Sequence, residues 1–258
     1  MLFGDKGYIE FKYEEQIAKW AEVAGKKGIE ILANPSQLAE WLQCEGTWFV
    51  GVDVLPNDSN GNLEEVKFPH TFSSLMKQIN LKPYHKAQLS VIFPGYPKPR
   101  DGDSEAAFEY RLKRDAAHVD GLLPIGIKRR RHLIEAHGII LGIPLNNTHS
   151  GASPIVVWEG SHLIMKKEFS SLLSKVPPSS WKNIDLTDTY IKARRNCFEN
   201  CKRTVIESPM GTGYALHPLL LHGITPWVSP SKGLESSNRQ VAYFRPLLNN
   251  VQDWLSIL

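Results

Sequence analysis

The 258-residue chain lacks the features that mark several classes of protein. It has only three cysteines, too few for the disulfide framework of a small secreted domain. It has no apolar run of the roughly 20 residues needed to span a bilayer. The first residues, Met1 to Lys6, lack an apolar signal core, so we expect a cytoplasmic protein that makes no membrane contact. A formal net charge of only +3 gives no reason to expect a nucleic acid partner.

The chain also lacks internal repeats and low-complexity tracts. A hydrophobic content of 42 % is enough for a sizeable core, and β-barrel enzymes of this length are often single units. We therefore expect one domain over residues 1–258. Cys197 and Cys201 lie four apart in a segment with helical spacing, but two thiols without further ligands make a poor zinc site. We expect ordinary reduced cysteines there.

Two histidines and one aspartate form the most informative pattern in the chain. His118-Val119-Asp120 places an imidazole and a carboxylate two positions apart, and His222 lies far downstream. Residues i and i+2 of a β-strand point to the same face, so His118 and Asp120 could reach one metal ion together. Two imidazoles and one carboxylate are the ligand set of non-haem Fe(II) oxygenases, in which the remaining metal positions stay open.

His217 competes with His222 as the third ligand. It lies five positions earlier, so strict strand alternation would place the two side chains on opposite faces, although Pro218 interrupts that pattern. Spacing alone leaves both histidines open; the family resemblance given below, in which Gly223 follows the distal histidine and an arginine lies further downstream, favours His222.

Arg239 begins a segment, residues 238–245, that is rich in β-forming residues and predicts a strand. A guanidinium is a planar fork that pairs bidentately with a carboxylate. Arg239 could therefore hold the far carboxylate of a keto acid whose other end chelates the metal. Arg245 shares the face of Arg239 but precedes Pro246 at the strand end, and is the less suitable anchor. The plainer alternative for Arg239 is a solvated arginine at the end of a strand.

Taken in order, four elements resemble the phytanoyl-CoA dioxygenase-like family of 2-oxoglutarate/Fe(II) oxygenases. They are His118-Val119-Asp120, Trp158-Glu159-Gly160-Ser161-His162, Leu221-His222-Gly223 and Arg239. The resemblance covers roughly residues 85–247. Glu159 stands where the family usually has proline, a departure that concerns a turn and does not touch the metal ligands.

The resemblance implies a double-stranded β-helix, the jelly-roll or cupin-like barrel. It implies Fe(II) bound by His118, Asp120 and His222, with O2 and 2-oxoglutarate as co-substrates. The keto acid would be held by Arg239, with further polar contacts from Thr225, Gln88 and Ser90. Halogenating relatives replace the carboxylate with a small residue, so the presence of Asp120 favours hydroxylation, or another oxidation, over halogenation. The resemblance implies hydroxylation of a small organic substrate that could be anionic, with release of succinate and CO2.

A dense basic run follows the first two ligands. It is a candidate anchor for an anionic group on the substrate, such as a carboxylate, a phosphate or an acyl-CoA, although a solvated loop is the plainer interpretation. The residues of this run are Lys128, Arg129, Arg130 and Arg131. His137, on the apolar segment that follows, is either a hydrogen-bonded core histidine or a residue of the substrate pocket. The loop at 94–103, rich in proline and glycine, is a candidate lid or a plain surface connection.

The overall pattern predicts a mainly β protein with helical additions. An N-terminal extension over about 1–84 carries helices at 14–25, from Pro35 onward and at 70–79, with a strand at 47–54. The barrel core, about 85–247, carries a short helix at 104–114. Its strands are expected at 88–93, 132–143, 153–158, 203–207, 214–216, 219–224 and 238–245. A helical insertion over about 163–202 interrupts the β pattern.

Three other functions use similar residues. A cupin-type isomerase or hydrolase could use the barrel with another metal, but would leave Arg239 unexplained. A zinc hydrolase could use two histidines and one carboxylate. An inactive barrel could act as a binding module, against which the presence of all three ligands and Arg239 argues. The primary substrate and the oligomeric state have no signature in the sequence.

Overall fold

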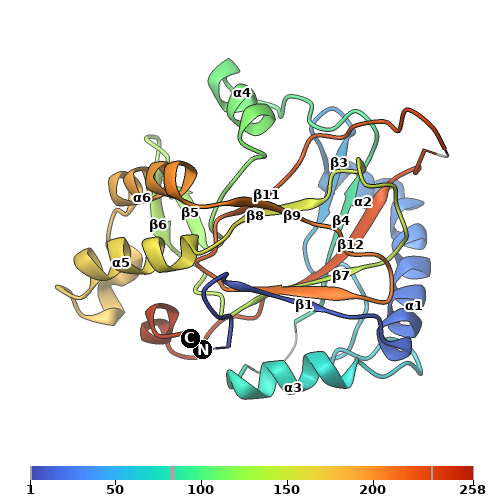
Figure 1. The fold of residues 1–258 in the computed structure, drawn as a ribbon, viewed down its shortest axis with the longest axis horizontal. Coiled ribbons are helices and arrows are strands. Elements are labelled where there is room, and N and C mark those ends of the chain that lie inside the picture. The colour runs from blue at the N-terminus through green and yellow to red at the C-terminus, as the bar shows by residue number, and fades with distance from the viewer. Residues whose placement is uncertain (1, 82–84, 234, 258) are drawn as a thin grey trace.

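Two antiparallel β-sheets form the centre of the molecule (Figure 1). The computed structural model describes residues 2–81, 85–233 and 235–257; residues 82–84, at the end of the predicted N-terminal extension, lie outside the described residues. The larger sheet has the strand order β1 (Tyr8–Phe11), β10 (Gly213–Leu216), β7 (Ile140–Pro144), β12 (Arg239–Phe244), β4 (Gln88–Ile92), β3 (Trp48–Gly51) and β2 (Leu42–Gln43). The smaller sheet has the order β11 (His222–Ile224), β8 (Ile155–Trp158) and β9 (Arg203–Ile206).

From β4 onward, the chain passes back and forth between the two sheets. β4 lies in the larger sheet, and the next extended residue, His118, bridges to β11 of the smaller one. β7 then returns to the larger sheet, β8 and β9 lie in the smaller, and β10, β11 and β12 alternate between the two. This alternation, with every pairing antiparallel, is the topology of a double-stranded β-helix and confirms the predicted fold class.

The space between the sheets is filled by alternate residues of the strands. Val241 and Tyr243 of β12 point inward and pack with Val157 of β8, whereas Ala242 and Phe244 point to the outer face. This is the two-residue alternation expected of a strand with both faces buried.

Helices α1 (Glu15–Leu32) and α3 (His70–Gln78) cover the outer face of the larger sheet (Figure 1). α1 is amphipathic, and its buried residues recur at helical spacing to form one apolar stripe against the sheet: Ile17, Trp20, Ala21, Ala24 and Gly28. The shorter helix α2 (Pro35–Trp41) begins as predicted, with Asn34 accepting a hydrogen bond from the Ser36 amide and proline at the first position.

The outer face of the smaller sheet is covered by the helical insertion predicted at 163–202. It consists of α5 (Ser161–Leu173), a 3₁₀ turn at Pro178–Asn183 and α6 (Thr187–Asn200), which lie together on one side of the molecule (Figure 1). Apolar residues of these helices pack with Val156 and Trp158 of β8 and with Trp254 of the 3₁₀ turn Val251–Leu255. Among the described residues, no helix is both long enough and apolar enough to cross a bilayer.

Three elements differ from the sequence-based expectations. The strand predicted at 132–143 is divided into β6 (Arg130–Leu133) and β7, and β6 pairs with β5 (Leu122–Ile125) in a separate hairpin. The break occurs because the amides of Ile134 and Glu135 donate to the Gly121 carbonyl, which turns the chain away from the sheet. β1 was not predicted, because its four residues show no clear alternation and are ordered by pairing with β10.

The third difference concerns the ligand segment. His118 and Asp120 do not lie on a regular strand, because only His118 pairs with another strand and Asp120 already lies in the turn that follows. Helix α4 (Glu105–Lys113), capped by the Ser104 hydroxyl, delivers the chain to this segment as expected.

Candidate metal centre

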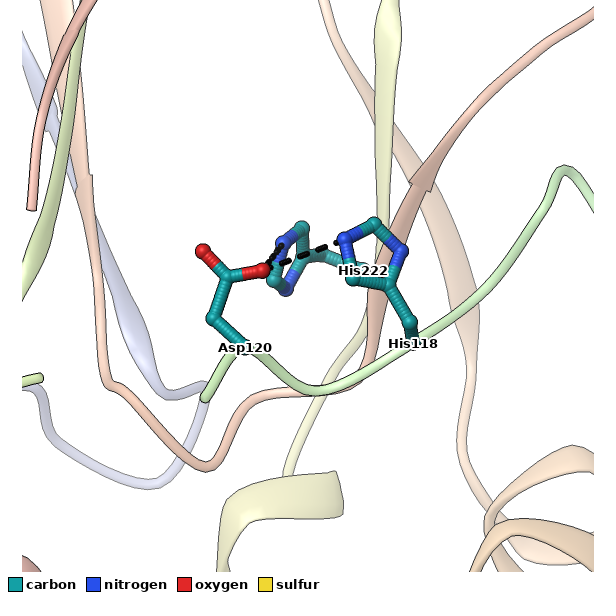
Figure 2. Close-up of side chains that lie close together, drawn as sticks. All are labelled: His118, Asp120 and His222. Atoms are coloured by element: carbon teal, nitrogen blue, oxygen red, sulfur yellow. Dashed lines mark ion pairs between the residues drawn. The ribbon is translucent and has the colours of Figure 1, made fainter. Parts of the chain in front are cut away.

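His118 and His222 are held opposite each other by a reciprocal pair of backbone hydrogen bonds. The His118 amide donates to the His222 carbonyl at 2.8 Å, and the His222 amide donates to the His118 carbonyl at 3.1 Å. In such an antiparallel pair the two side chains emerge side by side. The imidazole centroids consequently lie 4.6 Å apart, and both rings approach the Asp120 carboxylate (Figure 2).

The close approach of the two segments depends on Gly223. A Cβ at this position would lie 2.1 Å from the Asp115 carbonyl oxygen and 3.2 Å from Ala117 Cα, so only glycine fits without movement. The amide of Ile224 donates to the same Asp115 carbonyl. The Asp115 carboxylate accepts two hydrogen bonds from the Arg203 guanidinium of β9, at 2.8 and 2.9 Å. The chain leading to His118 is therefore tied to two strands of the smaller sheet.

The segment that carries His118 and Asp120 is held by two hydrogen bonds with tyrosines of the neighbouring helices. The Val119 amide donates to the Tyr190 hydroxyl of α6 at 3.3 Å, and the Tyr110 hydroxyl of α4 donates to the Ala117 carbonyl at 2.7 Å. After Asp120 the backbone turns at Gly121, whose φ of +83° favours glycine and whose added Cβ would lie 1.9 Å from the Glu135 carbonyl oxygen.

The hydrogen bonds of the two imidazoles leave one nitrogen of each free for a metal. His118 Nδ1 lies 2.9 Å from the Ala116 carbonyl, and His222 Nδ1 lies 2.9 Å from the Leu220 carbonyl. A carbonyl oxygen can only accept, so Nδ1 carries a proton in both rings and Nε2 is the atom left for a metal, which would displace the proton that His118 Nε2 shares with Asp120. The two Nε2 atoms lie 3.1 and 3.7 Å from Asp120 Oδ1, and the three donor groups, all within 4.8 Å of one another, could hold a metal ion.

The charges of the site suit a cation. Burial would raise the pKa of Asp120, but the His118 hydrogen bond and the neighbouring positive charges keep it well below its usual range, so the carboxylate is ionised. Burial and the charge of His118 lower the pKa of His222 to about 4, so its imidazole is neutral at pH 7. Burial would also lower the pKa of His118, but the bond to Asp120 outweighs it and raises that pKa.

Arg245, which the sequence argument placed second to Arg239, contacts the ligand set. Its Nη1 lies 3.4 Å from Asp120 Oδ2, and its Nη2 donates to Gln88 Oε1 at 2.6 Å. Gln88 is buried, as is Ser90 two positions along β4, whose hydroxyl accepts from the Trp48 indole at 3.1 Å. The two predicted polar residues of β4 thus orient Arg245 and Trp48, both of which line the cavity beside the histidines.

A cavity of about 830 Å³ opens on the ligand set. His118 and Asp120 lie in its wall, and the His118 side chain is 48 % exposed. The wall is rich in guanidinium groups, from Arg100, Arg111, Arg129, Arg131, Arg194 and Arg245. The end of the predicted lid loop, Arg100 to Asp103, contributes to the rim, and closure of this loop over the cavity stays a prediction.

Arg239 lies in a different cavity, of about 210 Å³, beside residues 148–154 and 206–209. Its guanidinium is buried between the sheets and hydrogen-bonds with the hydroxyls of Tyr214 and Tyr243, which are 2.8 Å apart. Its Nη1 has no hydrogen-bond partner, and within the described parts of the chain no carboxylate forms an ion pair with it. Arg239 and the metal-binding histidines therefore do not line the same cavity, but Arg239 retains one hydrogen-bond donor, Nη1, without a partner.

The other predicted residues are divided by the fold. Arg129 and Arg131 line the large cavity, but Lys128 does not, and Arg130 turns away to pair with Asp185 and Asp188. The run is divided because it spans the β5–β6 hairpin, where neighbouring residues point in opposite directions.

The remaining predicted residues lie outside the cavity wall. His137 does not line the cavity. Its imidazole is hydrogen-bonded to the Arg245 carbonyl at 2.7 Å and to the Glu135 carboxylate at 3.2 Å, as expected of a core histidine. Thr225 directly follows β11, and its amide donates to the Pro154 carbonyl. His217 lies apart from the ligand set, with Nδ1 accepting from the Leu219 amide.

The cavity is also lined by Tyr110, Tyr190 and Arg194, which had no place in the sequence argument. Tyr190 and Arg194 are four apart on α6, so helical spacing alone predicts that they share a face. Nothing local to α6 indicates that this face meets the segment around Val119, since that contact depends on how the insertion packs on the smaller sheet.

Neither the family models nor the curated proteins searched contain a match to the sequence. Similar solved structures include the non-heme alpha ketoglutarate dependent carbocyclase SnoK from nogalamycin biosynthesis, 14 % identical, with coverage of 100 % of this chain and 88 % of that one and a TM-score of 0.44. AviO1 from Streptomyces viridochromogenes Tue57 is 13 % identical, with coverage of 96 % and 92 % and a TM-score of 0.45. EctD from S. alaskensis, in its apoform, is 15 % identical, with coverage of 95 % and 74 % and a TM-score of 0.46. At such low identities and TM-scores, the assignment of an activity depends on the residues of the cavity.

Proposed function

We propose that this protein is a non-haem Fe(II)- and 2-oxoglutarate-dependent dioxygenase of the phytanoyl-CoA dioxygenase-like type, which hydroxylates a small organic substrate. The observation that carries the proposal is the convergence of His118 Nε2, His222 Nε2 and the Asp120 carboxylate beside a cavity of about 830 Å³. Two imidazoles and one carboxylate would occupy one side of the metal and leave its other positions for the co-substrates.

The residues present fit Fe(II). Both histidines have Nδ1 occupied by a backbone carbonyl, so Nε2 is directed at the metal position before any ion binds. Asp120 supplies the negative charge, and Arg245 orients its second oxygen. Such fixed orientation lowers the entropy lost when the ligands close around an ion.

The buried Arg239 fits the far carboxylate of 2-oxoglutarate. An unsatisfied buried N–H costs roughly 1–3 kcal/mol, and a carboxylate would satisfy the free Nη1 through a charge-assisted bond. The hydroxyls of Tyr214 and Tyr243 accept from the guanidinium and hold it in place. Thr225, at the end of β11, is the other candidate contact, while Gln88 and Ser90 act through Arg245 and Trp48.

When bound, Fe(II) with 2-oxoglutarate and O2 would supply the oxidising chemistry, with succinate and CO2 as the products from the keto acid. The protein's own contribution is to orient the substrate in the arginine-rich cavity beside His118 and Asp120 and to limit the access of water. Since Asp120 occupies the position that a halide would need, hydroxylation is the favoured outcome.

The direct test is anaerobic titration of the Fe(II)-loaded protein with 2-oxoglutarate, following the weak visible metal-to-ligand charge-transfer band. We expect a saturable band in the wild type and none in Asp120→Ala. Two matched variants identify the anchor: Arg239→Gln should weaken 2-oxoglutarate binding about ten-fold or more through loss of a charge-assisted hydrogen bond, whereas Arg245→Gln should not.

The opposite order of effects would assign the keto-acid carboxylate to Arg245. Absence of the band in wild-type protein that demonstrably holds Fe(II) would refute the 2-oxoglutarate assignment. A zinc hydrolase or cupin-type isomerase would then be favoured, and neither would show O2 uptake that depends on a keto acid.

A further inference from the structure

One wall of the large cavity carries three guanidinium groups without an acidic partner. Of the six arginines in the wall, Arg111 is paired with Asp103, Arg245 with Asp120, and Arg100 donates to Gln43. Within residues 2–81, 85–233 and 235–257, no carboxylate forms an ion pair with the other three, which are Arg129, Arg131 and Arg194. Like charges that share a cavity repel one another, so the apposition is unfavourable unless an anion offsets it.

Arg131 and Arg194 are held in place without the help of a carboxylate. The Arg194 guanidinium lies 4.5 Å from the ring centre of Tyr110 and 5.1 Å from that of Tyr190, a cation–π arrangement that fixes its plane. Arg131 donates from Nη1 to the Leu122 carbonyl at 3.0 Å, and its backbone bonds to Thr187 and Leu186 at the start of α6. Each guanidinium therefore retains donors for a ligand.

The three charges act on one another. Burial lowers the pKa of Arg131, and the positive charges of Arg129 and Arg194 add to that effect. Positive charge without a counter-ion in a partly buried place is unfavourable, and a bound anion would relieve it. Arg130, the sequence neighbour of Arg129 and Arg131, lies outside the cavity wall and is paired with Asp185 and Asp188. Among the arginines of this run, the lack of an acidic partner within the described residues is therefore particular to those in the cavity wall.

The same tyrosines connect this wall to the metal centre. Tyr110 donates to the carbonyl of Ala117, and Tyr190 accepts from the amide of Val119, so both hold the segment that carries His118 and Asp120. An anion bound against Arg194 would therefore be kept at a set position relative to the metal ligands, which is what selective oxidation of one substrate carbon requires.

We propose that Arg129, Arg131 and Arg194 form a subsite for an oxyanion of the substrate, and that this group is a dianion such as a phosphate monoester. That the bound anion is part of a substrate rests on the proposed oxygenase function, whereas anion binding by the three arginines does not. Three guanidiniums offer more positive charge than one carboxylate neutralises, and the planar guanidinium fork matches phosphate oxygens.

The test is calorimetric titration of the metal-free, full-length protein with inorganic phosphate, repeated with acetate at matched ionic strength. Removing the metal prevents phosphate from coordinating it. We expect one saturable phosphate site, with acetate binding at least about ten-fold weaker. Arg131→Gln and Arg194→Gln should each weaken phosphate binding about ten-fold or more, because each removes a charge-assisted hydrogen bond.

Lys128→Gln is the matched control, because it removes a charge from the same hairpin outside the cavity wall; phosphate affinity should not change. Arg194→Lys keeps the charge and most of the side-chain volume, and should show an intermediate loss, which keeps the test informative if a glutamine variant is unfolded by circular dichroism. Equal phosphate affinity in wild type and Arg194→Gln, or no saturable binding by the wild type, would overturn the subsite. Acetate binding as tight as phosphate would overturn the dianion.

The charge-transfer titration separates this inference from the proposed function. A band that persists in Arg194→Gln while phosphate binding is lost supports a subsite distinct from the keto-acid site. Phosphate binding that needs Arg131 and Arg194, in a wild-type protein that shows no band, supports the subsite and refutes the oxygenase.

Discussion

Replacing Gly223 with alanine tests how the fold builds the metal centre. The added Cβ would lie 2.1 Å from the Asp115 carbonyl oxygen, more than about 1 Å short of ordinary contact. The nearest neighbours of that Cβ are backbone atoms, so rotation of a side chain cannot relieve the clash, and the segment at 115–117 must move away from β11. We expect a loss of about 3 kcal/mol in the free energy of unfolding, the upper end of the range for overpacking.

The same movement should weaken metal binding. His118 is paired to His222 only through the bridge next to Gly223, and metal–ligand distances tolerate shifts of only about 0.2 Å. We expect the affinity for Co(II), as a stable substitute for Fe(II), to fall about ten- to a hundred-fold, as for loss of an outer-sphere partner. The assays are urea denaturation and spectroscopic Co(II) titration.

Gly126→Ala is the control for Gly223→Ala. Gly126 has a φ of +67° with open space around its Cβ position, so alanine there should cost about 1 kcal/mol through backbone strain alone and leave Co(II) affinity unchanged. Wild-type stability and affinity in Gly223→Ala would refute the close packing of 115–117 on β11. Lost stability with unchanged affinity would refute the connection between that packing and the metal ligands.

Three further predictions follow from contacts around the site. Tyr190→Phe removes the hydroxyl that accepts from the Val119 amide, and should lower the free energy of unfolding by about 1 kcal/mol and weaken Co(II) binding, measured by the same two assays. Metal at a hundred times its dissociation constant should stabilise the wild type by about 2.7 kcal/mol in thermal unfolding, an increase that EDTA reverses and that His222→Ala lacks. The third concerns His217, whose pKa burial lowers from 6.5 to about 3. Between these two pKa values the unfolded chain binds a proton that the folded protein does not. The free energy of unfolding should therefore be full above about pH 6.5 and fall by about 1.4 kcal/mol per pH unit below it. His217→Asn keeps an acceptor for the Leu219 amide and should flatten that slope, measured by urea denaturation between about pH 5 and about pH 7.

Local patterns predicted much of the secondary structure. The apolar stripe of α1, the Asn34 cap of α2 and the Ser104 cap of α4 are all encoded within a few residues of the element they stabilise. Elements that depend on distant partners were missed or misplaced. β1 is ordered by its pairing with β10. The segment predicted as one strand at 132–143 divides where the amides of Ile134 and Glu135 donate to the Gly121 carbonyl.

The arginines show the same limit at the site. The sequence favours Arg239 over Arg245 as the keto-acid anchor, and that assignment stays a prediction, but it gives no sign that Arg245 contacts Asp120. Arg245 follows the last residue of β12 and lines a different cavity from Arg239, so strand alternation does not fix its direction. How far each guanidinium lies from the ligand set depends on the register of β12 against β4. Arg194 entered the cavity only through the packing of α6.

The sequence by itself determined the chemistry that the chain carries: two imidazoles and a carboxylate in a given order, an arginine at the start of a predicted strand, and a basic run after the first ligands. These are properties of side chains and of their spacing along one element, and they survive without knowledge of the fold. Only the tertiary structure decided which groups meet. The bridge between His118 and His222, the division of the basic run and the grouping of Arg131 with Arg194 all depend on strand register and helix packing between segments far apart in the chain, for which the free energy comes from the whole core and not from any local pattern.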